Sequence, residues 1–484
     1  MTAVWGEITA QEIIPSITGE LISGPEGSVL SGISTDSREI IPGQLFIALR
    51  GEKYDGHDFV EKAIEKGASC IIKEKGRQIE IPENSGIAII VVPDTLRALG
   101  DLANWWRHQY NVIVAAITGS MGKTTTKEMT ANILDLSART LKNKGNFNNL
   151  IGLPLTLLRL EKGDRRAVLE MGMNLPGEIG RLTEISKPDV GLITNVARVH
   201  LEGLGDIMGV ARAKSELLEK IAPESHVILN GDDDLLMKEA SRFQREILTY
   251  GIGSGNDIRA AKIENLGYEG ISFVLQYHKS SIPVRIRVPG LHNLFNALAA
   301  SAIAICLKEP FGHIAKGLNN FDGIQGRFTV IPLPGDMVLV DDTYNSNPTS
   351  LKVSLDSVKT MAASRRGIVV GLGEMMELGD ETVAAHQEVG GMVAELGASY
   401  FLAMGDHARD MITGALKKGF SLKKAIEVKS HHEMAQTIRD KTKNGDLILL
   451  KGSRRIGLEQ VVRILKEERS EEDKNAQIEK DNGG

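Results

Sequence analysis

Short apolar runs alternate with amphipathic segments along most of the chain. In its middle part, runs of strand length are separated by stretches with helical periodicity. These runs occupy residues 112–117, 167–169, 190–194, 227–229 and 247–250. Strands that alternate with helices predict a mostly parallel sheet with crossover helices, and so an α/β fold class.

Both ends of the chain show the same alternation, and one internal region departs from it. Near the N-terminus we predict strands at 32–37, 44–49, 68–73 and 87–92 and helices at 58–66 and 95–106. Towards the C-terminus, strands at 337–340, 367–370, 400–403, 425–428 and 446–450 predict a doubly wound domain. Residues 258–288 alternate with period two, which predicts antiparallel strands in a small side sheet, and a helix follows at 291–307.

These changes of pattern divide the 484 residues into three domains, the number that the length also favours. The first domain ends near His108, and the glycine-rich residues 323–326 mark the second boundary. We expect domains at 1–108, 109–324 and 325–466, with hinges at the two boundaries. Residues 467–484 are charged and poor in apolar side chains, which predicts a disordered tail.

Composition narrows the class of protein. The chain is 42% hydrophobic and 25% charged, and its formal net charge of −6 argues against a general nucleic-acid-binding protein. No apolar run reaches the ~18 residues that span a bilayer, and the N-terminus lacks a signal-peptide pattern. Cys70 and Cys306 are in no metal-ligand spacing, which favours a reducing compartment. We expect a cytoplasmic monomer with no membrane or nucleic-acid partner.

The clearest local motif is Thr118-Gly-Ser-Met-Gly-Lys-Thr-Thr125, directly after an apolar strand and before a helix. Backbone N–H groups in such a turn form a cradle for phosphate oxygens. Lys123 can neutralise the β- and γ-phosphates, and the Thr124 hydroxyl can ligate Mg²⁺. The motif is shorter than the general P-loop pattern, because Ile117 stands where the first glycine is expected. The alternative is a glycine-rich turn without a ligand.

Polar residues follow other apolar strands as well. Glu170, His200 and Asp342 come shortly after the runs at 167–169, 190–194 and 337–340. Sites in parallel α/β sheets gather at the carboxyl ends of strands, so Glu170 is a candidate for the acidic Mg²⁺ partner that a P-loop needs. Taken alone, the three also have plainer explanations: an exposed carboxylate, a structural histidine and a turn.

Together these motifs resemble the Mur ligases, the ATP-dependent amide-forming ligases of peptidoglycan synthesis. The motifs occur in the family's order: Gly119–Thr125, Glu170-Met-Gly, Asn195–His200, Leu291-His-Asn-Leu-Phe-Asn296 and Asp341-Asp342. The resemblance covers all but about the last eighteen residues. It implies a UDP-substrate-binding N-terminal domain, a central ATP-binding P-loop domain and a C-terminal Rossmann-like domain.

Four further segments are similar to one branch of this family: 34–38, 145–154, 342–348 and 373–379. They favour the member that joins D-alanyl-D-alanine to UDP-N-acetylmuramoyl-tripeptide. The alternative is the related ligase that adds the third peptide residue, whose Asp-Asn-Pro-Arg motif is absent here. A P-loop kinase or a nucleotide-binding regulator is an alternative from another class. Residues 34–59 argue against a folylpolyglutamate synthase.

The resemblance implies a mechanism that uses ATP and Mg²⁺. ATP phosphorylates the substrate carboxylate, the incoming amine attacks the acyl phosphate, and a tetrahedral intermediate expels phosphate. The catalytic residues that the resemblance implies are Lys123, Glu170, His200, Lys214 and Arg327. The implied metal ligands are Thr124, Glu170, His200 and Lys214, the last of them as a carbamate.

The resemblance also implies which residues bind the substrates. Those for ATP are Thr118, Gly119, Ser120, Met121, Gly122, Lys123, Thr124, Thr125, His292, Asn293, Asn296, Arg327, Asp342, Tyr344 and Asn345. Those for the UDP-linked substrate are Ser37, Arg38, Asn148 and Asn149, and those for the dipeptide carboxylate are Lys451 and Ser453. Two of them have a structural alternative, a local turn at Ser37 and a loop cap at Asn149.

Overall fold

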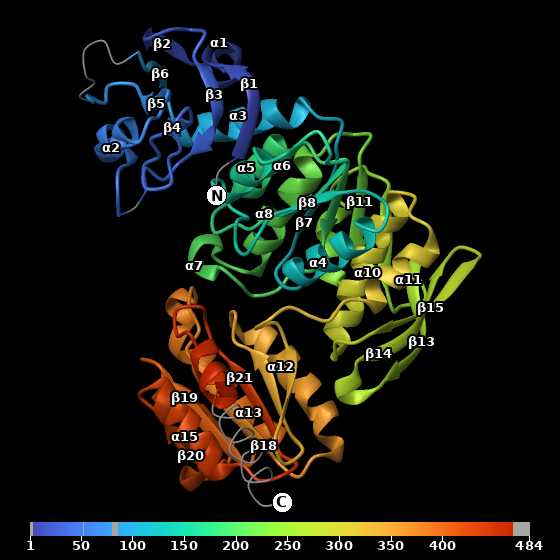
Figure 1. Ribbon diagram of the computed structural model, residues 1–484. Coiled ribbons are helices and arrows are strands. Elements are labelled where there is room, and N and C mark those ends of the chain that lie inside the picture. The colour runs from blue at the N-terminus through green and yellow to red at the C-terminus, as the bar shows by residue number, and fades with distance from the viewer. Residues whose placement is uncertain (1–2, 52, 80–85, 468–484) are drawn as a thin grey trace, which may run out of the picture.

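The computed structural model describes residues 3–51, 53–79 and 86–467. The described chain forms three sheets in sequence order, each covered by helices, and the central one lies between the other two (Figure 1). The mixed α/β class with three domains is therefore confirmed. Of the tail expected at 467–484, all but Glu467 lies outside the described residues.

The first sheet has six strands in the order β1-β3-β4-β5-β6-β2. Strands β3 to β6 are parallel, and β1 and β2 flank them as antiparallel edges. The strands are β1 (Ala3–Thr9), β2 (Glu20–Ser23), β3 (Val29–Ser34), β4 (Leu45–Ile47), β5 (Cys70–Glu74) and β6 (Ala88–Val92). The helices are α1 (Ala10–Ile13), η1 (Ile14–Ile17), η2 (Gly56–Phe59), α2 (Val60–Glu65) and α3 (Thr95–His108).

Sequence analysis missed both edge strands of this sheet and shifted one inner strand. Strand β2 is exposed along nearly its whole length, so no alternation of buried and exposed side chains marks it. The range of strand β3, Val29–Ser34, is shifted by three residues towards the N-terminus from the expected range 32–37, because residues 35–38 turn away from the sheet.

The second sheet has nine strands in the order β15-β14-β13-β12-β11-β10-β7-β9-β8. Its strands are β7 (Ile113–Thr118), β8 (Thr140–Lys142), β9 (Arg166–Glu170), β10 (Val190–Ile193), β11 (His226–Asn230), β12 (Ile247–Gly251), β13 (Ile258–Asn265), β14 (Ile271–Tyr277) and β15 (Ser280–Ile286). Its helices are α4 (Lys123–Leu134), α5 (Gly152–Leu157), α6 (Glu178–Ser186), α7 (Leu201–Leu204), α8 (Ile207–Lys220), α9 (Asp234–Ala240), η3 (Gly267–Glu269), α10 (Leu291–Cys306) and α11 (Phe311–Asn319). Helices α4, α10 and α11 pack on one face, and α6 and α8 pack on the other (Figure 1).

The prediction of a small side sheet at 258–288 is wrong in one respect. Its three strands are antiparallel to one another, as predicted, but they continue the central sheet instead of forming a separate one. The junction is a short parallel pairing in which Tyr250 lies opposite Ile258 and Gly251 opposite Arg259. A pairing of two residues leaves no pattern in the sequence that period-two alternation could reveal.

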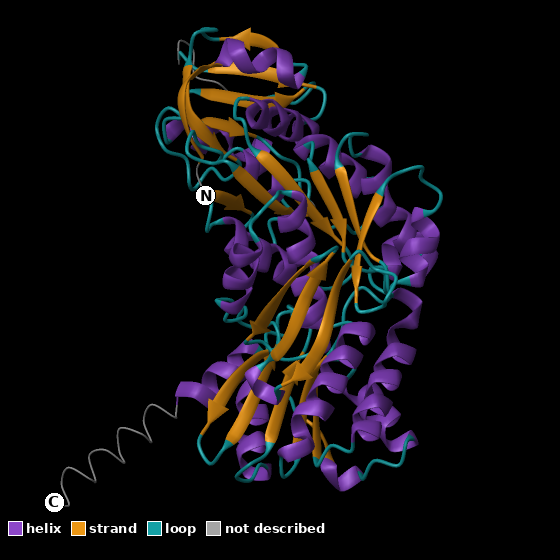
Figure 2. Cartoon of the chain, turned by 90° about the vertical axis from the view of Figure 1, so that its right-hand side faces the viewer, coloured by secondary structure: helices purple, strands orange, loops and turns teal. Residues whose placement is uncertain are grey.

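The third sheet has six strands in the order β16-β17-β21-β18-β19-β20, all parallel except β16 (Figure 2). They are β16 (Thr329–Leu333), β17 (Met337–Asp342), β18 (Ile368–Gly373), β19 (Tyr400–Met404), β20 (Ala425–Glu427) and β21 (Leu447–Lys451). The helices are α12 (Pro348–Met361), η4 (Ala362–Ser364), η5 (Gly379–Glu381), α13 (Thr382–Leu396), α14 (Ala408–Lys417), η6 (Leu422–Lys424), α15 (His431–Lys441) and a last helix that begins at residue 459. Sequence analysis missed β16, an edge strand that contains Pro332. Among the described residues no helix is long and apolar enough to cross a membrane.

Candidate active site

The loop between β7 and α4 requires glycine at two positions. Gly119 and Gly122 have φ angles of 142° and 81°, in the region that favours glycine. A Cβ atom on Gly119 would lie 1.8 Å from Oγ1 of Thr194, and one on Gly122 would lie 2.2 Å from Oδ1 of Asn296. The loop therefore lies tightly against its neighbours, and its backbone N–H groups are at the N-terminus of α4, where phosphate oxygens bind.

The segment that follows β10 supports this loop. The Met121 backbone N–H donates to Oδ1 of Asn195 at 2.9 Å, and the Thr194 hydroxyl donates to the Met121 carbonyl at 2.6 Å. The Ser120 hydroxyl accepts from the backbone N–H of Ala197 at 2.8 Å. Asn195 thus lies at the P-loop, as its place in the sequence motif led us to expect.

A hydroxyl–carboxylate pair that is a candidate for binding magnesium lies beside the P-loop. The Thr124 hydroxyl donates to Oε2 of Glu170 at 2.8 Å, at the carboxyl end of β9. Hydroxyl and carboxylate oxygens are the ligands that Mg²⁺ prefers, so these residues fit that ion. The described residues contain no cluster of three or more His, Cys, Asp or Glu able to hold a metal.

Two buried lysines from different elements lie close enough to interact, and one of them, Lys123, also interacts with Glu170. Nζ of Lys123 donates to the Gly119 carbonyl at 2.7 Å, and Lys214 on α8 is only 2% exposed. Burial lowers the pKa of Lys214 well below its usual value, and the charge of Lys123 lowers it further. No carboxylate among the described residues forms an ion pair with Lys214. The pKa of Lys123 is also lowered, mainly by burial, although Glu170 opposes this change. Burial thus favours the neutral form of the Lys214 amine, which is the form of a lysine that can react with CO₂.

Arg327 reaches this site from the third domain's side. One of its terminal N–H groups donates to the Thr124 hydroxyl at 3.1 Å, and its guanidinium lies 3.8 Å from the centre of the Tyr344 ring. Its Nε is buried and has no hydrogen-bond partner in the protein. An unpaired buried donor beside a phosphate cradle indicates an anionic ligand.

His200 lies at the boundary between the second and third domains. Its Nδ1 is 2.5 Å from Oε2 of Glu377, and the neighbouring Arg198 pairs with Glu381. This contact lowers the pKa of the Glu377 carboxyl. The structure thus joins His200 to the third domain, and within the described part of the chain His200 makes no hydrogen bond or ion pair with Thr124 or Glu170. Sequence analysis singled out the segment 373–379 but did not identify Glu377 as a site residue.

The residues expected at the nucleotide base make contacts within the protein. On α10, the side-chain amide of Asn293 donates to the Pro289 carbonyl at 2.7 Å and the amide of Asn296 donates to Oδ1 of Asn293 at 3.2 Å. The His292 ring packs edge-on against Phe328 with ring centres 5.2 Å apart. Burial lowers the pKa of His292 to about 4.

Lys451 is already paired in this structure. Its ammonium donates to Oδ2 of Asp342 at 2.7 Å and to the Asn345 carbonyl at 3.0 Å, and both charged groups are buried. The expected contact with a dipeptide carboxylate stays a prediction, and the observed pairing gives Lys451 a structural role. The hydroxyl of the nearby Ser453 is buried with no partner, so Ser453 retains a free donor.

The residues expected to bind the UDP-linked substrate are divided between two places. Arg38 is exposed and pairs with Asp36 at 2.7 Å, while Ser37 beside it is buried. Asn148 donates to Oε1 of Glu170 at 2.8 Å and therefore lies at the magnesium pair. Asn149 accepts from the backbone N–H of Gly152 at 2.9 Å, which is the loop cap left open as its alternative.

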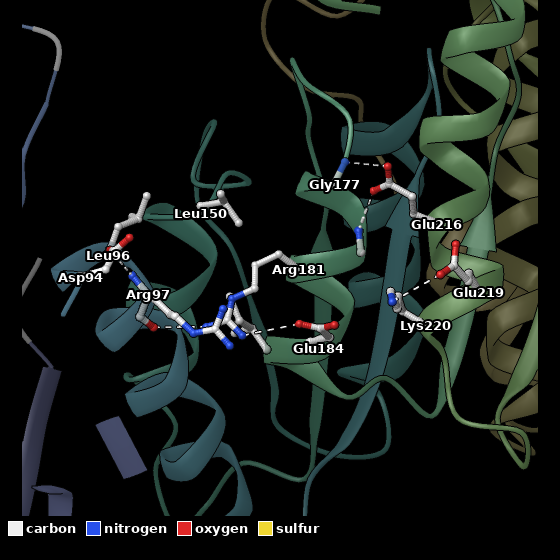
Figure 3. Close-up of a pocket in the computed structure, with 12 residues that line it drawn as sticks. Asp94, Leu96, Arg97, Leu150, Gly177, Arg181, Glu184, Glu216, Glu219 and Lys220 are labelled. Carbon is white, nitrogen blue, oxygen red and sulfur yellow. Dashed lines mark hydrogen bonds and ion pairs between the residues drawn. The ribbon is translucent and has the colours of Figure 1, made fainter. Parts of the chain in front are cut away.

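A separate cavity of about 550 Å³ lies among α3, α6 and α8 (Figure 3). No residue predicted for the site lines it. Its charged groups are paired: Arg181 binds Asp101 at 2.7 Å, and Glu216 accepts from the backbone N–H groups of Gly177 and Gly180.

Comparisons with known proteins identify the family. Residues 29–107 match the model "Mur ligase family, catalytic domain", residues 117–304 match "Mur ligase middle domain", and residues 326–454 match "Mur ligase, glutamate ligase domain". The chain belongs to the Mur ligase family. The resemblance found in the sequence motifs is thereby confirmed.

Individual members of the Mur ligase family are similar over almost the full length. The UDP-N-acetylmuramoyl-tripeptide–D-alanyl-D-alanine ligase of Escherichia coli is 34% identical over 95% of this chain and 98% of its own. The crystal structure of MurF from Acinetobacter baumannii has a TM-score of 0.84 and 33% identity, and covers 95% of this chain and 99% of its own. MurF from Thermotoga maritima, solved in complex with ADP, has a TM-score of 0.78 and 27% identity over 91% of this chain and 98% of its own.

Proposed function

We propose that this Mur ligase joins D-alanyl-D-alanine to UDP-N-acetylmuramoyl-tripeptide with ATP, the activity named for its 34% identical relative. The observation that carries the proposal is the contact of Arg327 with the Thr124–Glu170 pair. It places a cation from the start of the third domain at the P-loop, where a phosphoryl group would be transferred. A nucleotide-binding regulator would have no need of such an assembly.

The proposed reaction is the one that the resemblance to the Mur ligases implies, and the charges at this site suit it. A carboxylate oxygen of the tripeptide attacks the γ-phosphorus of ATP, and the bond to ADP breaks to leave an acyl phosphate. The amine of D-alanyl-D-alanine then attacks the acyl carbon, loses a proton and expels phosphate. Lys123, Arg327 and the loop N–H groups neutralise the phosphate oxygens during this transfer. Thr124 and Glu170 would hold Mg²⁺, which supplies further positive charge to the phosphates when bound.

The role assigned to Lys214 comes from the resemblance to the Mur ligases, and the burial of this lysine supports it. A neutral amine that reacts with CO₂ becomes a carbamate, which exchanges a potential cation for an anion. In the proposed site this carbamate and His200 would hold a second Mg²⁺, which would supply positive charge near the acyl phosphate. Burial without a counter-charge supports the first step of this assignment.

The three domains have separate tasks in this proposal. Residues 1–108 bind the UDP end through Ser37 and Arg38, and residues 109–324 bind ATP, with Asn148 and Asn149 towards the sugar or peptide. Residues 325–466 bring Arg327, Tyr344 and Asn345 to the nucleotide and Ser453 to the dipeptide. We further propose that the enzyme acts as a monomer in the cytoplasm, with no nucleic-acid or membrane partner.

One assay tests the function. ATP and UDP-N-acetylmuramoyl-tripeptide are combined with the enzyme, and phosphate release is compared with D-alanyl-D-alanine and with single amino acids as second substrate. We expect release that depends on both the tripeptide and the dipeptide. Release with UDP-N-acetylmuramoyl-dipeptide and a single amino acid would favour the ligase that adds the third residue, and turnover without an amine would favour a kinase.

A further inference from the structure

Where strand β8 ends, the side chain of Asn143 takes over the hydrogen bonds that the main chain of β8 would otherwise make to strand β9. Strand β8 ends at Lys142, which lies opposite Val168 of the parallel strand β9. Beyond this point, Oδ1 of Asn143 accepts from the Glu170 backbone N–H at 2.9 Å, and its Nδ2 donates to the Glu170 carbonyl at 2.9 Å. The amide thus makes both hydrogen bonds that a strand neighbour's main chain would make, and it makes them to the carboxylate residue of the magnesium pair.

Asn143 is itself held from two further directions. The side chain is 1% exposed, and Nδ2 also donates to the Phe147 carbonyl at 2.8 Å. The Asn143 carbonyl accepts from Nζ of Lys127 at 2.6 Å, and Lys127 is a buried residue on α4, the helix that follows the P-loop. Every polar group of the side chain is therefore satisfied inside the protein, which restricts its rotation.

The loop that begins at Asn143 returns to the same carboxylate. Asn148 donates to Oε1 of Glu170 at 2.8 Å, and the Asn148 carbonyl accepts from the Gly172 backbone N–H at 2.8 Å. A Cβ atom on Gly172 would lie 2.8 Å from Oδ1 of Asn148, so the loop and the end of β9 are in close contact. Asn143 fixes the main chain of Glu170, and Asn148 fixes its carboxylate.

We propose that Asn143 is a positioning residue that holds Glu170 in place to bind Mg²⁺. Through the same hydrogen bonds, the loop 143–149 and Glu170 form one structural unit. The inference rests on the proposed function, because it takes Glu170 as a ligand of nucleotide-bound Mg²⁺. Partners that orient a ligand typically change metal affinity by about 10–100-fold when they are removed. Since Asn148 lies in the same unit, a substrate that contacts this loop acts on the metal ligand through the same hydrogen bonds.

The test measures metal binding directly. Mn²⁺, a probe that electron paramagnetic resonance detects, is titrated into the full-length enzyme in the presence of ADP. We expect Asn143→Ala to weaken Mn²⁺ binding about tenfold. The matched control is Asn104→Ala, because the Asn104 amide also makes two hydrogen bonds to main-chain carbonyls, those of Glu184 and Ile185, at 3.1 and 2.9 Å. The control should lower the melting temperature by a similar amount and leave Mn²⁺ binding unchanged.

A double-mutant cycle separates positioning from a general loss of structure. In a Glu170→Ala background, which itself weakens Mn²⁺ binding, Asn143→Ala should have less than a twofold further effect, since its target is gone. Asn143→Asp replaces the alanine variant in the test if that variant does not fold. It keeps the acceptor oxygen but loses both hydrogen bonds that Nδ2 donates, and it should also weaken Mn²⁺ binding. Unchanged binding in the folded Asn143 variants, together with loss in Glu170→Ala, overturns the inference alone. Unchanged binding in Glu170→Ala overturns the proposed magnesium site as well.

Discussion

The central domain has two neighbours, and the two interfaces are built from different interactions. On the N-terminal side, the rings of Trp5 and Trp106 stack with centres 4.9 Å apart, and their indole N–H groups donate to the carbonyls of Leu158 and Leu160. These residues belong to one continuous apolar core that includes both domains. On the C-terminal side, charged side chains make the contacts: Arg198 with Glu381, His200 with Glu377, and Arg327 with Thr124.

From this difference we predict one fixed connection and one movable connection. Burial of aromatic surface holds two domains in one arrangement, whereas exposed ion pairs contribute about 0–1 kcal/mol each and exchange readily with water. Sequence analysis expected hinges at both boundaries. With α3 packed into the central domain, we now expect motion mainly at residues 323–326, where Gly323 and Gly326 have φ angles of 93° and 74°. The UDP site would then move with the central domain, and the third domain would close on both.

The largest effect is expected at the fixed interface. Trp106→Ala removes a side chain that is 2% exposed and should lower the free energy of unfolding by about 3–5 kcal/mol in urea denaturation. The control is Trp105→Ala, which removes the half-buried neighbouring ring and should have a smaller effect. A loss below about 1 kcal/mol for Trp106→Ala would contradict the idea of one shared core.

The movable interface should matter for turnover and little for stability. Arg327→Ala should slow ATP turnover about 100–1000-fold, because it removes a cation at the transferred phosphoryl group, while the UDP-linked substrate binds nearly as before. Arg365→Ala is the control, since Arg365 also contacts the central domain, over the ring of Tyr268, but away from the P-loop. An Arg327→Ala enzyme at full speed would show that the third domain does not complete the site.

Acid should weaken the movable interface through His292, which packs against Phe328. The pKa of His292 is lowered to about 4 in the folded protein, from 6.5. Above pH 6.5 the His292 ring is neutral in both the folded and the unfolded protein. Between pH 6.5 and 4 only the unfolded chain takes up the proton, so the free energy of unfolding decreases as the pH falls. This one group should contribute about 3 kcal/mol to the loss. Urea denaturation of His292→Gln should show a shallower decline, and the exposed His432→Gln should follow the wild type.

The smallest effect is expected for an exposed pair at the movable interface. Glu381→Gln removes the partner of Arg198 and should change the free energy of unfolding by less than about 0.5 kcal/mol. It should nevertheless increase the radius of gyration in solution scattering with an ATP analogue and the UDP-linked substrate. Glu395→Gln breaks a similar exposed pair with Lys418 inside the third domain and should leave the scattering unchanged. Identical profiles for the two variants would mean that the ion pairs do not bias closure.

Local patterns predicted the parts of the molecule that local sequence determines. The strand-loop-helix order around Lys123 and the place of Glu170 at a strand end followed from apolar runs and one motif. The partners of Lys451 and His200 did not, because Asp342 is 109 residues from Lys451 and Glu377 is 177 residues from His200. Sequence analysis did not identify Asn143 for another reason. The sequence around an asparagine in a charged loop does not indicate whether its amide is exposed to water or makes hydrogen bonds to a neighbouring strand.

The edges of the three open sheets bear on how this enzyme avoids aggregation while its domains separate. An unpaired edge strand can recruit the same strand of another molecule and start a growing assembly. Here β2, β8 and β20 are only four, three and three residues long. Proline interrupts β15 at Pro283 and β16 at Pro332, and the pairing of β1 with β3 is irregular between Val4 and Ile8. Within the described residues, the sheets therefore present no long regular strand edge on which a fibre could grow.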